Sequence, residues 1–341
     1  MNKKYTVGSL YAGVGGICMG FMKSGFKMQW ANEYDKNACI TYRENFSHNL
    51  IEGDIMDIDE SKLSNVDILT AGFPCQPFSV AGYRKGFRDN RGNHFFKILD
   101  IVDETRPKVL FLENVKNLVG HDGGKTFKLI EKEIRDRGYT FDSKVLNTKD
   151  FGNIPHNRER IFIIAFDKEF LNDENFKFNF PQADKLTKKI KDILIKDEVD
   201  SKFYYGQDKY MYPMLKESMR RDDTVYQFRR QYVRENKSNV CPTLTANMGT
   251  GGHNVPLVKT EYGFRKLTPR ECFRFQGFPD TFKLPNIANS HLYKQSGNSV
   301  SMPVIYRLAS EIKVVLDTLA SKRNQELLET AQGIQVIQSF Q

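Results

Sequence analysis

The chain has 341 residues, of which 40% are hydrophobic and 27% charged, and it carries a net charge of +9. No run approaches the roughly 20 apolar residues of a membrane-spanning helix, and no apolar secretion signal follows Lys3 and Lys4. Five scattered cysteines predict reduced thiols in a cytoplasm, with neither a disulfide framework nor a metal site. The basic excess fits a polyanionic partner such as nucleic acid, although many basic proteins bind nothing acidic.

The first half of the chain alternates strand-like apolar runs with helical patterns. Strands are expected at about 5–11, 28–32, 49–53, 66–71, 109–113, 145–147 and 161–166. Helices are expected at about 13–24, 95–104 and 125–137, and another follows the second strand and ends near residue 42. This alternation predicts an α/β fold whose doubly wound, largely parallel sheet has helices on both faces.

A change of composition near residue 170 predicts a second lobe. Residues 171–260 are polar and rich in Lys and Tyr, without the α/β alternation of the first part. Helical patterning resumes after Pro269, and a helix beginning at Pro303 should pack back on the first lobe. We therefore expect a first lobe at 1–170, a second at 171–260, a connection and return at 261–320, and a polar tail at 321–341.

A glycine-rich turn follows the first expected strand, in Tyr11-Ala12-Gly13-Val14-Gly15-Gly16. Glycines here let a ligand approach the backbone closely, although a plain tight turn would look the same. Glu33 ends the second strand, 20 residues after Gly13, where nucleotide-binding α/β folds place an acid for ribose hydroxyls. Asp54 follows Gly53 at the end of the third strand and can accept from an adenine amino group, although either acid could simply cap a helix or lie on the surface. Because no Arg or Lys accompanies the glycines to meet a pyrophosphate, S-adenosylmethionine fits this pattern.

Cys75 lies between two prolines in Gly72-Phe73-Pro74-Cys75-Gln76-Pro77-Phe78-Ser79, just after the strand expected at 66–71. The carboxyl end of such a strand faces the crevice where α/β sheets bind ligands. A cysteine more often simply packs in a core. Glu113 ends a neighbouring strand, and a thiol and a carboxyl that converge beside a methyl donor suggest methylation at C5 of a pyrimidine. The thiolate would add to C6 while the acid protonates N3, which makes C5 nucleophilic.

Arg158 and Arg160 lead into the last strand of this series. Residues two apart on a strand face the same side, so both guanidiniums could point into one pocket. There they could bond a base carbonyl and orient Glu113, although two solvated arginines would be ordinary on a basic protein.

The chain resembles the DNA (cytosine-5-)-methyltransferases over nearly its full length, with six motifs in the family's order. The glycine turn is similar to the first cofactor motif, with Tyr11 where the family usually has Phe, and the segment around Cys75 resembles the nucleophile motif. Further along, Glu113-Asn114-Val115 resembles ENV, and Arg158-Glu159-Arg160 the end of Q-x-R-x-R, with His156 in place of the usual Gln. The last two matches are Arg265-Lys266-Leu267-Thr268-Pro269-Arg270-Glu271, which joins the lobes, and Gln295-Ser296-Gly297-Asn298-Ser299-Val300 at the cofactor.

This resemblance implies a Rossmann-like methyltransferase fold with a smaller target-recognition lobe, S-adenosylmethionine as cofactor with S-adenosylhomocysteine as product, and no metal. It implies catalytic roles for Cys75, Glu113, Arg158 and Arg160. The implied cofactor contacts are Tyr11, Gly13, Gly15, Gly16, Glu33, Asp54, Ile55, Pro74, Asn298 and Ser299. The implied DNA contacts are Gln76, Ser79, Arg84, Arg88 and Arg91, on and beside a loop that should close over DNA, with Arg229, Arg230 and Thr243 in the second lobe.

The second lobe carries the expected base readout. The stretch from Tyr226 to Arg234 interleaves aromatics with arginines and glutamines. Arg pairs well with guanine and Gln with adenine in the major groove, although any one of these residues could equally contact only phosphate.

The sequence therefore predicts a bacterial modification methylase that makes 5-methylcytosine within a short double-stranded site. We expect a cytoplasmic monomer whose functional partner is a cognate restriction endonuclease. One alternative is a tRNA cytosine-5-methyltransferase on the same scaffold, disfavoured by the large second lobe with its Thr243-Leu244-Thr245-Ala246-Asn247 stretch. Another is a catalytically idle DNA- or nucleotide-binding protein, disfavoured because the thiol, the acid and both arginines are present.

Overall fold

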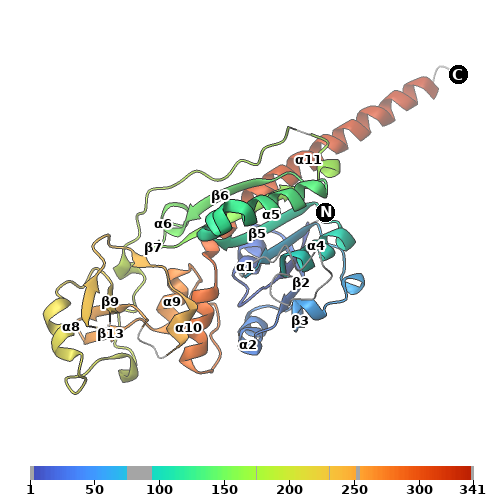
Figure 1. Cartoon of the computed structure of the whole chain (residues 1–341). Coiled ribbons are helices and arrows are strands. Elements are labelled where there is room, and N and C mark those ends of the chain that lie inside the picture. Colours follow the sequence, from blue (N-terminus) through green and yellow to red (C-terminus); the bar gives the residue numbers. More distant parts are fainter. Residues whose placement is uncertain (1–3, 75–93, 174, 230, 251–253, 339–341) are drawn as a thin grey trace.

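The structure is a computed structural model that describes residues 4–74, 94–173, 175–229, 231–250 and 254–338. A large lobe surrounds a seven-stranded sheet, and a smaller lobe lies beside it (Figure 1). From edge to edge the sheet contains β3 (Asn49–Glu52), β2 (Lys27–Glu33), β1 (Thr6–Leu10), β4 (Ile68–Gly72), β5 (Val109–Val115), β8 (Glu159–Phe166) and β6 (Asp142–Asn147).

The sheet is largely parallel, which confirms the predicted fold class. The first five strands of this order run parallel, whereas β8 pairs antiparallel with both β5 and β6. The sheet reverses its strand order beside β1, which places the glycine turn after β1 and the carboxyl end of β4 at a switch point. Open α/β sheets bind ligands in the crevice at such a point.

Both faces of the sheet are buried. On β5, Val109 and Phe111 pack into one core, and Leu110 and Leu112 into the other. The first core is covered by α1 (Gly16–Lys23), α2 (Lys36–Asn45) and α11 (Met302–Gln338), and the second by α4 (His94–Thr105) and α5 (Lys125–Asp136). The continuous apolar run of β5 follows from this two-sided burial.

Short elements connect the large lobe's strands and helices. The turns between β3 and β4 are η1 (Ile55–Asp57) and η2 (Glu60–Lys62), and η3 (Lys116–Gly124) follows β5. The connections around β8 are α6 (Thr148–Phe151), β7 (His156–Asn157) and α7 (Lys168–Leu171).

The small lobe contains a four-stranded sheet of β10 (Tyr232–Glu235), β9 (Tyr226–Arg229), β12 (Leu257–Thr260) and β13 (Gly263–Lys266), in that order. Beside it lie η4 (Ile190–Asp192), η5 (Ser201–Phe203), α8 (Tyr212–Ser218) and η6 (Ala246–Gly249). β11 (Cys241–Pro242) pairs in parallel with β7, so a two-stranded bridge joins the lobes.

The connection between the lobes is well anchored. α9 (Pro269–Phe275) begins with a capping box in which Thr268 and Glu271 bond each other's backbone N–H groups. Glu271 also forms a fully buried ion pair with Arg265, 2.7 Å between Nη2 and Oε1. From α9, Phe273 packs into the core of the large lobe and Phe275 into that of the small lobe, and α10 (Asn289–Asn298) follows.

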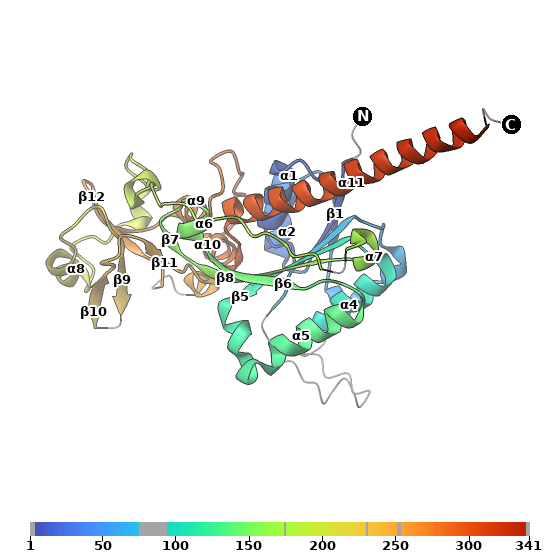
Figure 2. The ribbon, with the colours of Figure 1, turned by 90° about the horizontal axis from the view of Figure 1, so that it is seen from above.

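One expectation from the sequence needs correction. Phe178 is buried in the large core, so the chain does not leave the large lobe at residue 171. The segment around Phe178 lacks the helix-period apolar pattern by which we assigned residues to the large lobe. It is held there by the aromatic cluster around Phe166. The last helix continues to Gln338 and projects far from the body (Figures 1 and 2), so the polar tail expected from residue 321 extends this helix.

Candidate active site and cofactor pocket

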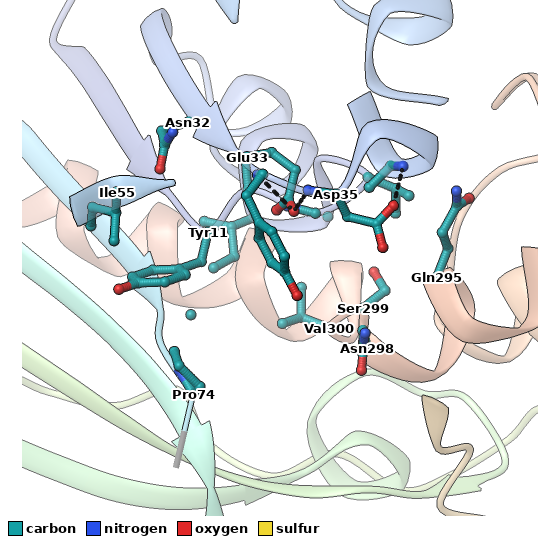
Figure 3. A pocket seen from close by; sticks show the side chains of 18 of the residues that line it. Tyr11, Asn32, Glu33, Asp35, Ile55, Pro74, Gln295, Asn298, Ser299 and Val300 are labelled. Atoms are coloured by element: carbon teal, nitrogen blue, oxygen red, sulfur yellow. Dashed lines mark hydrogen bonds between the residues drawn. The ribbon is translucent and has the colours of Figure 1, made fainter. Parts of the chain in front are cut away.

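A pocket of about 490 Å³ opens at the switch point of the sheet. Its walls come from the turn after β1, the ends of β2, β4 and β5, and the end of α10 (Figure 3). The structure places all but one of the predicted cofactor residues on this wall: Tyr11, Gly13, Gly16, Glu33, Asp54, Ile55, Pro74, Asn298 and Ser299. The exception is Gly15, which caps α1 with a φ of 86° and has the ring of Phe46 where a side chain would be.

The buried carboxylate of Glu33 shapes the glycine turn. Its Oε2 accepts from the backbone N–H of Gly13 at 2.7 Å, and its Oε1 accepts from the N–H groups of Tyr34 and Asp35. Burial raises the pKa of Glu33 despite these hydrogen bonds. Gly13 has a φ of 57° and nothing within 4 Å of the place of a Cβ, so the backbone there is open to a ligand. Asp54 is the N-cap of η1 and accepts from Met56 N–H with one oxygen.

The opposite wall brings buried polar atoms to the same pocket. Ser299 Oγ and Gln295 Nε2 are buried and have no hydrogen-bond partner within the described chain. A Cβ on Gly16 would lie 2.9 Å from Ser299 Oγ, so a glycine is required for this close approach. Buried polar groups are normally paired, so these two atoms are suited to a polar ligand.

The lining of the pocket is rich in acidic side chains. Four carboxylate side chains line it, from Glu33, Asp35, Asp54 and Glu113. Contrary to the sequence-based expectation, a lysine also reaches the pocket: Lys294 arrives from α10, 259 positions away from its partner Asp35. Its Nζ lies 2.7 Å from Asp35 Oδ2, and this pairing lowers the pKa of Asp35 (Figure 3). Because Lys294 is paired with Asp35, it does not offset the other acidic side chains of the pocket.

Glu113 lies at the edge of the pocket and is paired with Arg160. Glu113 ends a buried stretch of β5 and is only 8% exposed. Arg160, on the antiparallel neighbour β8, places its Nε 3.1 Å from Glu113 Oε1. Burial raises the pKa of Glu113, and the charges of Arg160 and Arg158 reduce this rise without cancelling it. The carboxyl is therefore suited to holding a proton and giving it up to a base nitrogen.

The structure does not place both guanidiniums in the pocket: neither Arg158 nor Arg160 lines it, and of the two Arg160 alone pairs with the lining residue Glu113. Arg158 bonds elsewhere. Its side chain is 2% exposed and donates to the carbonyls of Leu244, Gly297 and Ser299. Arg158 falls between β7 and β8, so the strand alternation behind the prediction does not extend to it. It ties the segment that follows β11 to the end of α10.

His156, like Arg158, links segments that are far apart in the sequence. It is fully buried, and its Nε2 accepts from Leu244 N–H at 3.2 Å while its Nδ1 donates to Phe275 O at 3.0 Å. Burial, followed by the charge of Arg158, lowers the pKa of His156 well below its ordinary value. A glutamine amide could make the same two hydrogen bonds, which accounts for His156 at a position where the family usually has Gln.

Several predicted residues lie elsewhere or outside the described residues. Thr243 is exposed, and its hydroxyl donates to Asn157 O at 2.6 Å. Arg229 is exposed on β9. Outside the described residues lie Cys75, Gln76, Ser79, Arg84, Arg88, Arg91 and Arg230.

Sequence reasoning missed part of the pocket wall. Tyr34, Asp35 and Lys294 line it but belong to no motif or spacing rule that we applied. The Tyr11 hydroxyl, which the family's usual Phe lacks, lies 2.9 Å from His94 Nδ1 at the start of α4. Among the described residues, no cluster of three or more His, Cys, Asp or Glu side chains could hold a metal ion. Of the helices that the structure describes, none is both long and apolar enough to cross a membrane.

Comparison with known proteins identifies the family. A family model for C-5 cytosine-specific DNA methylases matches residues 5–314. The chain is 58% identical over 311 residues to the type II methyltransferase M.Bsp6I of Bacillus sp. (strain RFL6), covering 90% of this chain and 98% of that protein. It is 41% identical over 310 residues to the type II methyltransferase M.HaeII of Haemophilus aegyptius, covering 91% and 93%.

The fold agrees with this assignment. The crystal structure of the S. pombe Dnmt2 methyltransferase matches with a TM-score of 0.67 and 21% identity, covering 93% of this chain and 99% of that one. At that identity the likeness concerns the fold alone. The chain belongs to the C-5 cytosine-specific DNA methylases, and its activity is that of a DNA (cytosine-5-)-methyltransferase.

Proposed function

We propose that the pocket binds S-adenosylmethionine, which when bound supplies an electrophilic methyl group on a sulfonium. The acidic lining suits this cationic ligand, and the volume lies in the usual range of about 300–1,000 Å³ for such sites. Glu33 and Asp54 would face the ribose and adenine, and Asn298 and Ser299 the opposite side. The unpartnered Ser299 Oγ supports a polar contact there.

We propose that Glu113 acts in catalysis as the proton donor to the cytosine. Cys75, directly after the pocket residue Pro74, adds its thiolate sulfur to C6 of the cytosine while Glu113 donates a proton to N3. The C5 carbon then takes the methyl group, C5 loses its proton, and β-elimination breaks the S–C6 bond to return the thiolate. The support is a buried carboxyl with a raised pKa, held by Arg160 at the pocket edge.

The substrate cytosine lies in double-stranded DNA, within a short specific sequence. Neither Cys75 nor Glu113 could reach a stacked base, so the cytosine is rotated out at a cost of a few kcal/mol. The small lobe faces the other side of the duplex, and affinity falls steeply with salt because phosphate contacts release counterions. We further propose that one subunit acts alone in the cytoplasm and protects DNA from a cognate restriction endonuclease.

The test is covalent trapping on duplexes that contain 5-fluorocytosine, where fluorine replaces the proton that must leave C5. With S-adenosylmethionine present, the wild-type chain should become linked to the DNA in a complex that survives denaturing electrophoresis. Cys75→Ser should bind DNA and cofactor without forming the link. A linked serine variant, or a wild type that is never trapped although it methylates cytosine, would defeat the thiol mechanism. Tritium transfer to duplex DNA but not to tRNA would settle the nucleic-acid class.

A further inference from the structure

We propose that the hairpin of β9 and β10 enters the major groove as a two-stranded ribbon, and that Arg229 and Arg234 on it read guanines while Gln227 holds both guanidiniums. The name ribbon refers here to residues 226–229 and 232–235. This inference rests on the proposed function, because it assigns the base-reading element of the same methyltransferase.

The ribbon projects beyond its own sheet. β9 pairs with β12 at a single position, Tyr226 with Leu257, whereas it pairs with β10 along its whole length. β10 is the edge of the four-stranded sheet. Past Tyr226, two strands therefore continue alone, and a two-stranded ribbon of this kind fits the roughly 12 Å wide major groove.

The two faces of the ribbon differ sharply in character. Phe228 and Val233 pack from one face onto the small core that contains Leu215 of α8. The register places Gln227 opposite Arg234 and Arg229 opposite Tyr232, so these four side chains share the other face. Arg229, Tyr232 and Arg234 are exposed there. The ribbon is thus supported from behind and presents a polar, basic front.

The positive charge of this front is not neutralised. No carboxylate of the described chain lies within 4.0 Å of the guanidinium of Arg229 or Arg234, whereas nearby Arg221 is paired with Asp223 and Glu235. In Figure 2 the strands β9 and β10 and the turns that follow β5 lie toward the same side of the molecule. A polyanion lying along that side would meet both.

The hydrogen bonds of Gln227 decide which base the ribbon favours. Its Oε1 accepts from Arg229 Nη2 at 3.1 Å and also from Arg234 Nη2. Adenine readout by Gln needs that oxygen as an acceptor for the base amino group, so Gln227 is not free to read adenine as the sequence suggested. It is instead a positioning residue that orients two guanidiniums, each of which has further N–H groups for guanine O6 and N7.

The experiment uses the full-length enzyme and a library of duplexes with randomised bases around a cytosine, read by bisulfite sequencing. Wild type should select a motif with guanines. In Arg229→Lys and Arg234→Lys the charge remains but the bidentate fork is lost, so each should relax a different guanine position by roughly 5- to 150-fold in relative rate. Lys216→Gln, an exposed charge change on α8, is the matched control and should keep the motif.

Gln227 is tested by a pair of variants. Gln227→Ala removes the shared acceptor and should weaken both guanine positions at once, whereas Gln227→Glu retains an oxygen acceptor and should restore guanine selection. Thermal melts of every variant exclude loss of fold. An unchanged motif in both lysine variants would overturn base readout by the ribbon. The same conclusion would follow if Arg229→Gln and Arg234→Gln lowered the methylation rate equally on all sequences and only weakened its salt dependence. If wild type methylated no duplex at all, the proposed function itself would fail instead.

Discussion

Arg160 Nε lies 3.1 Å from Glu113 Oε1 across two antiparallel strands of the central sheet. Burial has the largest effect on the pKa of Glu113 and raises it, which favours the neutral carboxyl. The charge of Arg160 is the largest opposing effect and limits this rise. The arginine thus holds the Glu113 carboxyl in place and limits the rise of its pKa.

Removal of this arginine should alter the pH dependence of methylation. In Arg160→Ala the pKa of Glu113 rises further, so the loss of activity that accompanies its ionisation moves to higher pH. The maximal rate should fall about 100-fold because the carboxyl is no longer oriented. Single-turnover rates against pH would show this for Arg160→Ala, with Arg135→Ala as a control that breaks an exposed ion pair with Glu131. An unmoved alkaline limb would contradict the role given to Arg160.

Loss of Arg158 should affect stability first. Arg158→Ala leaves three buried carbonyls without their donor, so the free energy of unfolding should fall by about 3 kcal/mol. Urea denaturation would measure the change. Arg323→Ala is the matched control, since this exposed arginine also donates to a backbone carbonyl, that of Phe170, and should cost little. Equal losses in the two variants would contradict the buried clamp.

The neutral state of His156 should make stability fall in mild acid. Its folded-state pKa is depressed, so below about pH 6.5 the unfolded chain binds a proton that the folded chain does not. Stability is therefore complete above that pH and declines as pH falls, by up to about 1.4 kcal/mol per pH unit for one group. His48, whose pKa is also lowered by burial, acts in the same direction.

His156→Gln separates the two histidines. The variant keeps both hydrogen bonds and should show a shallower decline of unfolding free energy between about pH 6.5 and 5, with only the His48 share remaining. Urea denaturation over this pH range checks the slope, and a His48→Gln, His156→Gln double variant should be flatter still. A wild-type slope in His156→Gln would show that His156 is protonated in the folded chain.

Gly297 should tolerate no side chain. A Cβ there would lie 2.2 Å from the carbonyl carbon of Thr245, and this neighbour is backbone that cannot rotate away. Gly297→Ala should therefore force α10 and η6 apart and cost about 3 kcal/mol, with weaker cofactor binding. Gly120→Ala is the control, because nothing lies within 4 Å of its Cβ position. A melting temperature equal to that of the control would disprove the close contact.

Much of this architecture follows from local sequence. The strands of the large lobe could be predicted because their apolar runs are buried on both faces, and the glycine turn and Glu33 because their spacing is set by one βα unit. Glu113 could be placed because it follows directly on the apolar run of β5, although the strand itself continues to Val115.

Contacts between distant segments could not be predicted. Arg158 depends on carbonyls of Leu244 and Ser299, and Lys294 reaches the pocket from the far end of the chain. Gln227 shows the limit most clearly. Its residue type suggested adenine, and only the cross-strand register reveals that Arg234 occupies its oxygen.

The pocket joins the turn after β1 to the end of α10, so its two walls come from opposite ends of the polypeptide. A nascent chain that has emerged from the ribosome only as far as the small lobe contains the wall after β1 but lacks the wall at the end of α10. The pocket is therefore complete only after residue 300 has been synthesised, so a chain interrupted before that point lacks the wall that α10 supplies.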